Sequence, residues 1–157
     1  MDLFTLLEYL HILGAMVLFG TGLGIAFFVF MADRSGDVAV IAGTARIVVI
    51  ADFLFTASAV VLQPLTGLGM AHIAHFHLWE SWIAISLGLY GCVGLFWLPV
   101  VWLQIEITKM AEAALAAGTP LPPRYRRFMR AWFFCCWPAF AAVLAILYFM
   151  VTKPEYW

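Results

Sequence analysis

The sequence predicts an all-α integral membrane protein, a polytopic chain whose four transmembrane helices form an up-down bundle. Of its 157 residues, 66% are hydrophobic and 11% are charged. A soluble domain carries about 25% charged residues. Four apolar runs each exceed the roughly 20 residues that a helix needs to cross a bilayer. The connections between them are short, which favours helices that alternate in direction.

The four runs cover residues 3–31, 38–68, 79–107 and 131–151. They leave connections at 32–37, 69–78 and 108–130, and the whole chain, 1–157, forms one domain. The third connection starts as an Ala-rich helical extension and breaks at residues 118–123, where closely spaced prolines cannot continue a helix. The N-terminal run is longer than the apolar region of a signal peptide and carries Asp2 and Glu8, so a cleavable signal is not expected.

Two further patterns concern helix packing. Gly88, Gly91 and Gly94 repeat at helical spacing in the third run, which predicts close approach of another helix. Pro99 and Pro138 predict kinks in the third and fourth helices.

The distribution of basic residues predicts the orientation. The first connection with its flank, and the third connection, hold almost all of them: Arg34, Arg46, Lys109, Arg124, Arg126, Arg127 and Arg130. The opposite side has only Lys153. Because cytoplasmic loops of membrane proteins are enriched in Lys and Arg, both termini and the 69–78 loop are expected outside the cytoplasm. The net charge of −1 gives no basic surface for nucleic acid.

His11 is the strongest candidate site residue. It lies about 12 Å below the outer end of the first helix, at 1.5 Å per residue. Gly22 shares its face and Gly14 lies beside it, so a flat macrocycle has room to approach. This pattern suits an axial haem ligand, with Glu8 one turn away to orient the other ring nitrogen. The alternative is a histidine that bonds a neighbouring helix, with the small residues serving helix packing.

Asp52 lies near the middle of the second run. Thr56, Ala59 and Gln63 continue its helical face, which predicts a polar stripe toward the bundle interior. The stripe suits proton transfer, contact with a polar cofactor edge, or an interhelical hydrogen-bonded network.

Arg46 lies nearer the cytoplasmic end of the same run. Three roles stay open for it. It can extend to the headgroups, pair with Glu106 at the same depth on the third helix, or bind a propionate or phosphate.

The 69–78 loop contains the other three histidines. His72 and His75 are one helical turn apart, and so are His77 and Glu80. Imidazoles suit copper, zinc or haem iron, although this spacing is no established metal signature. If a second histidine of the same chain binds the haem iron with His11, it must come from this loop, and His77 is the first choice. The alternative is a set of interfacial histidines with no ligand role.

Several short motifs carry a family resemblance. They are residues 10–24 (LHILGAMVLFGTGLG), Ala45-Arg46, Ala51-Asp52, residues 64–67 (PLTG), residues 125–127 (YRR) and residues 148–154 (YFMVTKP). Together they resemble a bacterial family known only as predicted integral membrane proteins, a domain of unknown function. The helix-one histidine and the closing Lys-Pro also look like the HemJ-type protoporphyrinogen oxidases, and more distantly the copper-resistance CopD-type domains. The resemblance implies a multi-pass protein of the bacterial inner membrane in which His11 lies against haem.

Residues 127–130 (RFMR) replace the Asn-Glu-Val-Pro stretch of the HemJ group, so protoporphyrinogen oxidation is not expected. The leading hypothesis is a b-type haem protein, or an oxidoreductase subunit, that passes electrons between a membrane quinone or dehydrogenase and an external acceptor such as a c-type cytochrome. The alternatives are copper handling by the histidine loop and a cofactor-free structural subunit of a larger complex. An enzyme acting on a lipid-soluble substrate such as a porphyrin is a fourth, weaker hypothesis. The sequence leaves association into homo-oligomers open.

Overall fold

A computed structural model describes all residues, 1–157, and confirms the all-α prediction. Its helices form four rods that are long and apolar enough to cross a membrane. The second rod combines two α-helices with a short π-helix between them. The elements are α1 (Leu3–Ser35), α2 (Val38–Ala51), η1 (Asp52–Thr56), α3 (Ala57–Ile73), α4 (Ser81–Ala117) and α5 (Pro123–Thr152).

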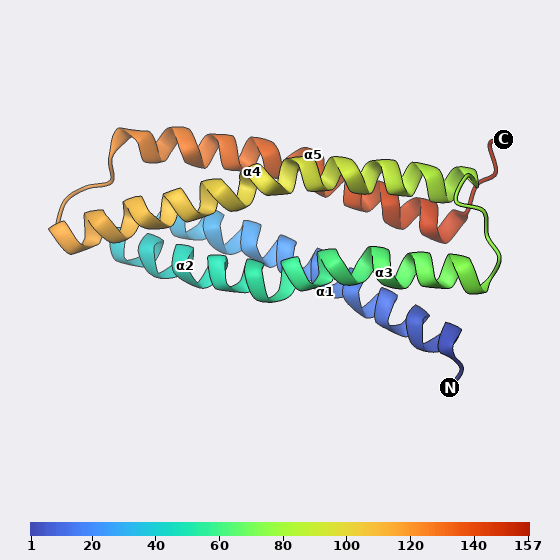
Figure 1. Ribbon diagram of the computed structural model, residues 1–157. Helices are drawn as coiled ribbons and strands as arrows, with labels where there is room; N and C mark the ends of the chain where they lie inside the picture. The colour runs from blue at the N-terminus through green and yellow to red at the C-terminus, as the bar shows by residue number, and fades with distance from the viewer.

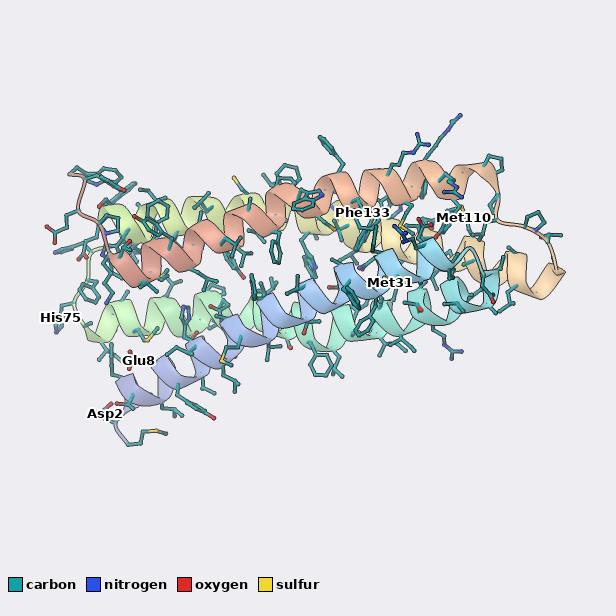
Figure 2. The ribbon with its side chains drawn as sticks, turned by 180° about the vertical axis from the view of Figure 1, so that it is seen from behind. Asp2, Glu8, Met31, His75, Met110 and Phe133 are labelled. Carbon is teal, nitrogen blue, oxygen red and sulfur yellow. The ribbon has the colours of Figure 1, made fainter.

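The rods run alternately up and down along one axis (Figure 1). Both chain termini and the α3–α4 loop lie at one end, called here the terminal end. Figure 2 places Asp2, Glu8 and His75 together there. The α1–α2 turn and the α4–α5 connection lie at the other end, called here the arginine end because most of the basic residues flank it. The predicted up-down topology is therefore confirmed.

The helices extend beyond the predicted apolar runs. α1 continues to Ser35, where Gly36 adopts a left-handed conformation with φ 68°, and α4 continues to Ala117 before Gly118, with φ 61°. Residues 123–130 were expected in a loop, but they form the first turns of α5. Pro123 occupies the start of that helix, where its missing N–H costs nothing. Hydropathy found the membrane-crossing parts and missed the polar extensions.

The prolines inside helices do not end them. α4 continues through Pro99, α5 through Pro138, and α3 contains Pro64 as well. The irregularity of the second rod is instead the π-helix at Asp52, where the amide of Ala57 bonds the carbonyl of Asp52 five residues earlier. Such wide turns are rare in proteins overall, but those that occur are often found at functional sites.

The apolar core occupies only the half of the bundle next to the arginine end. Helices α1, α2, α4 and α5 contribute to it, with Ala111 fully buried and Trp132 1% exposed. No residue of α5 beyond Trp132 is buried. The core residues are Ile25, Val29, Ala32, Ile41, Ala42, Val48, Val100, Leu103, Ile107, Ala111, Tyr125, Met129 and Trp132.

The other half of the bundle, called here the terminal half, consists of two helix pairs. There α3 packs on α1, and α4 packs on α5. Few contacts join the pairs. The Tyr90 hydroxyl donates to the carbonyl of Val60, and the rings of Phe19 and Phe140 stack with centroids 5.0 Å apart. Most residues buried in this half are small or polar.

The C-terminal tail is fixed over the start of α4. The buried Ser81 hydroxyl donates to the carbonyl of Pro154 at 2.6 Å and accepts from the amide of Tyr156 at 3.0 Å. The ammonium of Lys153 lies 5.3 Å from the Trp82 ring centroid and 5.8 Å from that of Phe76. The Lys153-Pro154 motif therefore attaches the C-terminal tail to the start of α4 at the terminal end of the bundle.

Leu103→Ala should lower the free energy of unfolding by about 2–5 kcal/mol, because it leaves a cavity in the packed core. Leu98→Ala in the same helix is the control. Leu98 is 63% exposed, and lipid is as apolar as leucine, so its loss should change stability little. Thermal unfolding in lipid nanodiscs measures both. Equal losses for the two variants would contradict this placement of the core.

Candidate functional site

His11 lies at the packed interface between α1 and α3 and is half-buried. Its Nδ1 is 2.8 Å from the hydroxyl oxygen of Thr66 on α3. Thr66 is buried and belongs to the 64–67 motif, although sequence reasoning did not single it out. The structure thus joins two of the motifs that carry the family resemblance.

The direction of this hydrogen bond follows from the other bonds of Thr66. Its hydroxyl lies 2.8 Å from the carbonyl of Leu62 one turn earlier and donates its single proton to the helix backbone. The same oxygen must then accept from His11, so Nδ1 carries the ring proton. This assignment, inferred from the network, leaves Nε2 with a bare lone pair. A histidine held in this way through one nitrogen is ready to bind a metal through the other.

Gln63 holds the backbone of His11. Its amide nitrogen donates to the carbonyl of His11 at 2.8 Å. Glycine makes this approach possible, because a Cβ built on Gly14 would lie 2.6 Å from that nitrogen. A Cβ on Gly67 would lie 3.1 Å from Cε1 of the imidazole. Gly14 therefore packs against α3, which agrees with the alternative that the small residues serve helix packing. A Cβ on Gly22 would meet nothing within 4 Å, so that surface is open.

Glu8 does not orient the imidazole. It is exposed, and no hydrogen bond joins it to His11. Thr66 takes the role that the sequence assigned to Glu8, because the side chain of Thr66 projects from the neighbouring helix directly onto the ring.

The polar stripe on the second rod faces the bundle interior as predicted. Asp52, Thr56 and Ala59 are buried, and Gln63 is half-buried. The indole nitrogen of Trp97 is 3.4 Å from Oδ1 of Asp52, which is long for a hydrogen bond. Oδ2 of Asp52 and the hydroxyl of Thr56 have no partner within the protein. The π-helix therefore carries two buried oxygen atoms at mid-depth that are open to a proton or a polar ligand.

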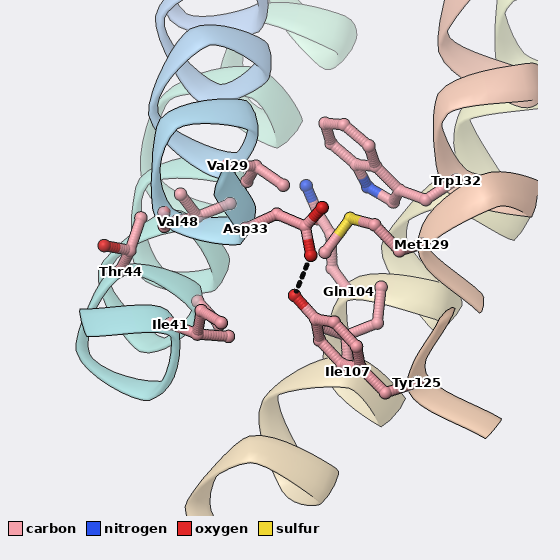
Figure 3. A pocket seen from close by; sticks show the side chains of 12 residues that line it. Val29, Asp33, Ile41, Thr44, Val48, Gln104, Ile107, Tyr125, Met129 and Trp132 are labelled. Atoms are coloured by element: carbon pink, nitrogen blue, oxygen red, sulfur yellow. Dashed lines mark hydrogen bonds between the residues drawn. The ribbon is translucent and has the colours of Figure 1, made fainter. Parts of the chain in front are cut away.

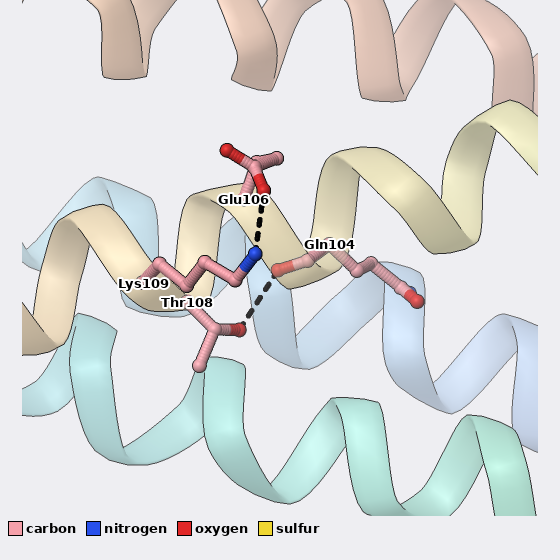
Figure 4. Close-up of polar contacts among 4 residues, drawn as sticks. All are labelled: Gln104, Glu106, Thr108 and Lys109. Carbon is pink, nitrogen blue, oxygen red and sulfur yellow. Dashed lines mark hydrogen bonds and ion pairs between the residues drawn. The ribbon is translucent and has the colours of Figure 1, made fainter.

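Arg46 does not pair with Glu106. The Glu106 carboxylate instead forms an ion pair of 2.8 Å with Lys109, one turn along the same helix (Figure 4). Arg46 is exposed and has no ion pair, which agrees with extension toward the headgroups. The expected Arg46–Glu106 pair is wrong because a cation on the same helix lies closer to the carboxylate.

The histidine loop does not form a cluster of metal ligands. His72 lies in the last turn of α3, His75 has a positive φ of 57°, and both are exposed, as is His77. The Glu80 carboxylate accepts from the backbone amide of His77 at 2.9 Å and from the indole of Trp82 at 3.1 Å, so it stabilises its own turn. Nowhere do three His, Cys, Asp or Glu side chains gather in a way that could hold a metal ion.

These features define a polytopic membrane protein with four spanning helices and a histidine fixed between two of them. The chain belongs to the family described as "Predicted integral membrane protein (DUF2269)", whose model matches residues 5–154. No curated protein and no solved structure matches the chain. The resemblance to HemJ-type and CopD-type proteins therefore stays a prediction.

Gly14→Ala should weaken the packing of α1 on α3 by about 1–3 kcal/mol, because the new methyl group displaces Gln63 from the His11 carbonyl. Gly22→Ala, which meets nothing, should be neutral or slightly stabilising through helix propensity. A double-mutant cycle with Gln63→Ala, read by thermal unfolding, tests the cause. The cost of Gly14→Ala should largely vanish without Gln63, and additive losses would refute this explanation.

Proposed function

We propose that this protein binds haem b through His11 and transfers electrons as a membrane protein or as a subunit of a redox complex. The observation that carries the proposal is the 2.8 Å contact between Nδ1 of His11 and the Thr66 hydroxyl, from which we infer the tautomer of His11. Thr66 fixes the proton on Nδ1 and leaves Nε2 free to bind iron. When bound, haem supplies one-electron chemistry within the membrane.

The packing of the terminal half supports the same proposal. The large apolar core lies elsewhere, α5 has no buried residue in this half, and few contacts join its two helix pairs. A planar apolar group would find polar anchors here without displacing a close-packed core. His11 would supply one axial ligand. His77, in the loop at the same end, is the proposed second ligand, with His72 and His75 as alternatives.

The mid-depth polar groups have a complementary role in this proposal. Asp52 offers a buried carboxylate oxygen, Oδ2, one helical turn from the buried hydroxyl of Thr56. An ionisable group inside a membrane bundle is suited to a proton-relay role. Arg46, exposed on the other half of the bundle, is assigned to the headgroup region rather than to the haem site.

Orientation sets the direction of electron transfer. Most Lys and Arg residues flank the arginine end, so that end is proposed to face the cytoplasm of a bacterial cell. His11 then lies on the outer side, near an external acceptor such as a c-type cytochrome. The donor is proposed to be a membrane quinone or a dehydrogenase.

A second candidate function is that of a cofactor-free structural subunit. One observation favours it: Gly88 and Gly91 of α4 are exposed, and a Cβ at either would meet nothing within 4 Å. They do not serve close packing inside this chain, so a second helix that approached them closely would belong to a partner. Copper handling by the histidine loop has no comparable support, because the loop gathers no set of three metal ligands.

The absorbance spectrum tests the haem proposal. The purified chain, reduced with dithionite, should show Soret and α bands, and His11→Ala should abolish both because iron loses its proposed ligand. Glu8→Ala, one turn from His11 in the same helix, is the control for general damage and should leave the bands in place, because Glu8 is exposed and makes no hydrogen bond to His11. A wild-type protein without these bands, or bands undiminished in His11→Ala, would refute the proposal.

Variants of Thr66 test separately whether its hydroxyl orients His11. Thr66→Val keeps the shape but removes the hydroxyl that accepts from Nδ1, so haem affinity measured by titration should fall about 10–100-fold. Thr66→Ser keeps the hydroxyl and should retain most of the affinity. Equal affinities in the two variants would show that the Thr66 hydroxyl does not orient His11 for haem.

The orientation is tested with reporter fusions. Alkaline phosphatase fused after Trp157 should be active, because the terminal end is proposed to lie outside the cytoplasm. The same enzyme inserted between Gly118 and Thr119, in the α4–α5 connection, should be inactive. Green fluorescent protein at the two positions should give the opposite pattern. The reversed result at both positions would invert the proposed topology.

A further inference from the structure

A small cavity lies within the core near the arginine end, where α1, α2, α4 and α5 meet. Its volume is about 20 Å³. Apolar side chains form most of its wall, but polar groups from all four helices, Thr44 of α2 among them, also line it (Figure 3). The polar residues that concern the argument are Asp33 of α1, Gln104 of α4, and Tyr125 and Trp132 of α5. None of them belongs to the proposed haem site.

One polar atom of this cavity has no partner. Trp132 is 1% exposed, and its indole nitrogen makes no hydrogen bond within the protein. Leaving such a donor without a partner costs about 1–3 kcal/mol, so native proteins rarely do so. Figure 3 shows the indole nitrogen, the Gln104 amide and the Asp33 carboxylate directed toward the same space. The buried donor therefore calls for a ligand that accepts a hydrogen bond.

The neighbouring groups define the rest of that ligand. The Tyr125 hydroxyl donates to Oδ1 of Asp33 at 2.9 Å, which leaves other lone pairs of the carboxylate free. Gln104 is 5% exposed, and no hydrogen bond engages its side chain. A ligand that accepts from the amide nitrogen of Gln104 and donates to the Asp33 carboxylate would satisfy both groups. An anion is excluded by the carboxylate, and an apolar molecule by the unpartnered donor.

The volume of the cavity sets the size of the ligand. About 10–15 Å³ of such space holds one water molecule, and buried waters usually make about three hydrogen bonds. A cavity of about 20 Å³ therefore admits one water and excludes a quinone ring.

We propose that this cavity is a hydration site for one water molecule that accepts from the Trp132 indole and the Gln104 amide nitrogen and donates to Asp33. The site is built by side chains from α1, α4 and α5, and the water adds further hydrogen bonds between these helices to the one that Tyr125 and Asp33 already form. It makes the Asp33–Tyr125 pair part of a buried polar network. The proposal is independent of haem binding.

Radiolytic labelling tests the proposal in the full chain. Nanodiscs in water enriched in heavy oxygen are irradiated with X-rays, and mass spectrometry measures heavy oxygen at Met129. Met129 lines the cavity and is only 5% exposed, so a label there requires water inside. Ala45→Val fills the cavity and should abolish the label. Ala42→Val, at a residue that is equally apolar and buried in α2 but outside the cavity wall, should leave it unchanged.

A second measurement protects the test against a variant that fails to fold. In the wild-type chain, the indole N–H of Trp132, assigned by its loss in Trp132→Phe, should show magnetisation transfer from water in NMR spectra. Absence of the Met129 label in the wild type, equal labelling in Ala45→Val and Ala42→Val when both fold, or an indole proton without contact to water would each overturn the proposal.

Discussion

The constraint on which this structure depends is that polar groups inside a bilayer have no water to bond and must find partners within the protein. The partners come from neighbouring helices. His11 bonds Thr66, Gln63 bonds the carbonyl of His11, and Tyr90 bonds the carbonyl of Val60. Apolar side chains cannot by themselves choose between lipid and a neighbouring helix, because both are equally apolar. These hydrogen bonds therefore set which helices pair and in which register.

The bundle is divided into two unlike halves as a consequence. Near the arginine end, large apolar side chains and two aromatic residues of α5 fill the space between four helices. In the terminal half, most buried residues are small or polar, and specific hydrogen bonds replace close apolar packing. A half held by a few directional bonds tolerates a bound planar group better than a filled core does, because cores lose stability when they are overpacked. The candidate site thus lies in the half of the bundle that has the least close apolar packing.

Hydropathy predicted much of the fold, because length and apolarity alone decide which segments cross a bilayer. The inward direction of the Asp52 stripe was also predictable, since an ionisable face must avoid lipid. The hydrogen-bond partners that join different helices could not be predicted from the sequence. Thr66 and His11 are 55 positions apart, and their contact depends on the relative rotation of α1 and α3. The Glu106–Lys109 pair shows the opposite case, because Arg46 on another helix was considered as a partner of Glu106 and Lys109, one turn away, was not. The continuation of α5 through the arginine-rich segment was missed because its first turns are too polar to extend an apolar run.

Asp52 gives the strongest argument that this bundle does more than span the membrane. Its Oδ2 and the Thr56 hydroxyl are buried without partners, and each such group costs about 1–3 kcal/mol. An apolar pair of the same shape would avoid that cost, so packing alone does not explain these residues. The π-helix adds to the case, because it widens the turn that carries both of them. A destabilised acidic group at mid-depth is what a protein needs if it is to accept a proton there.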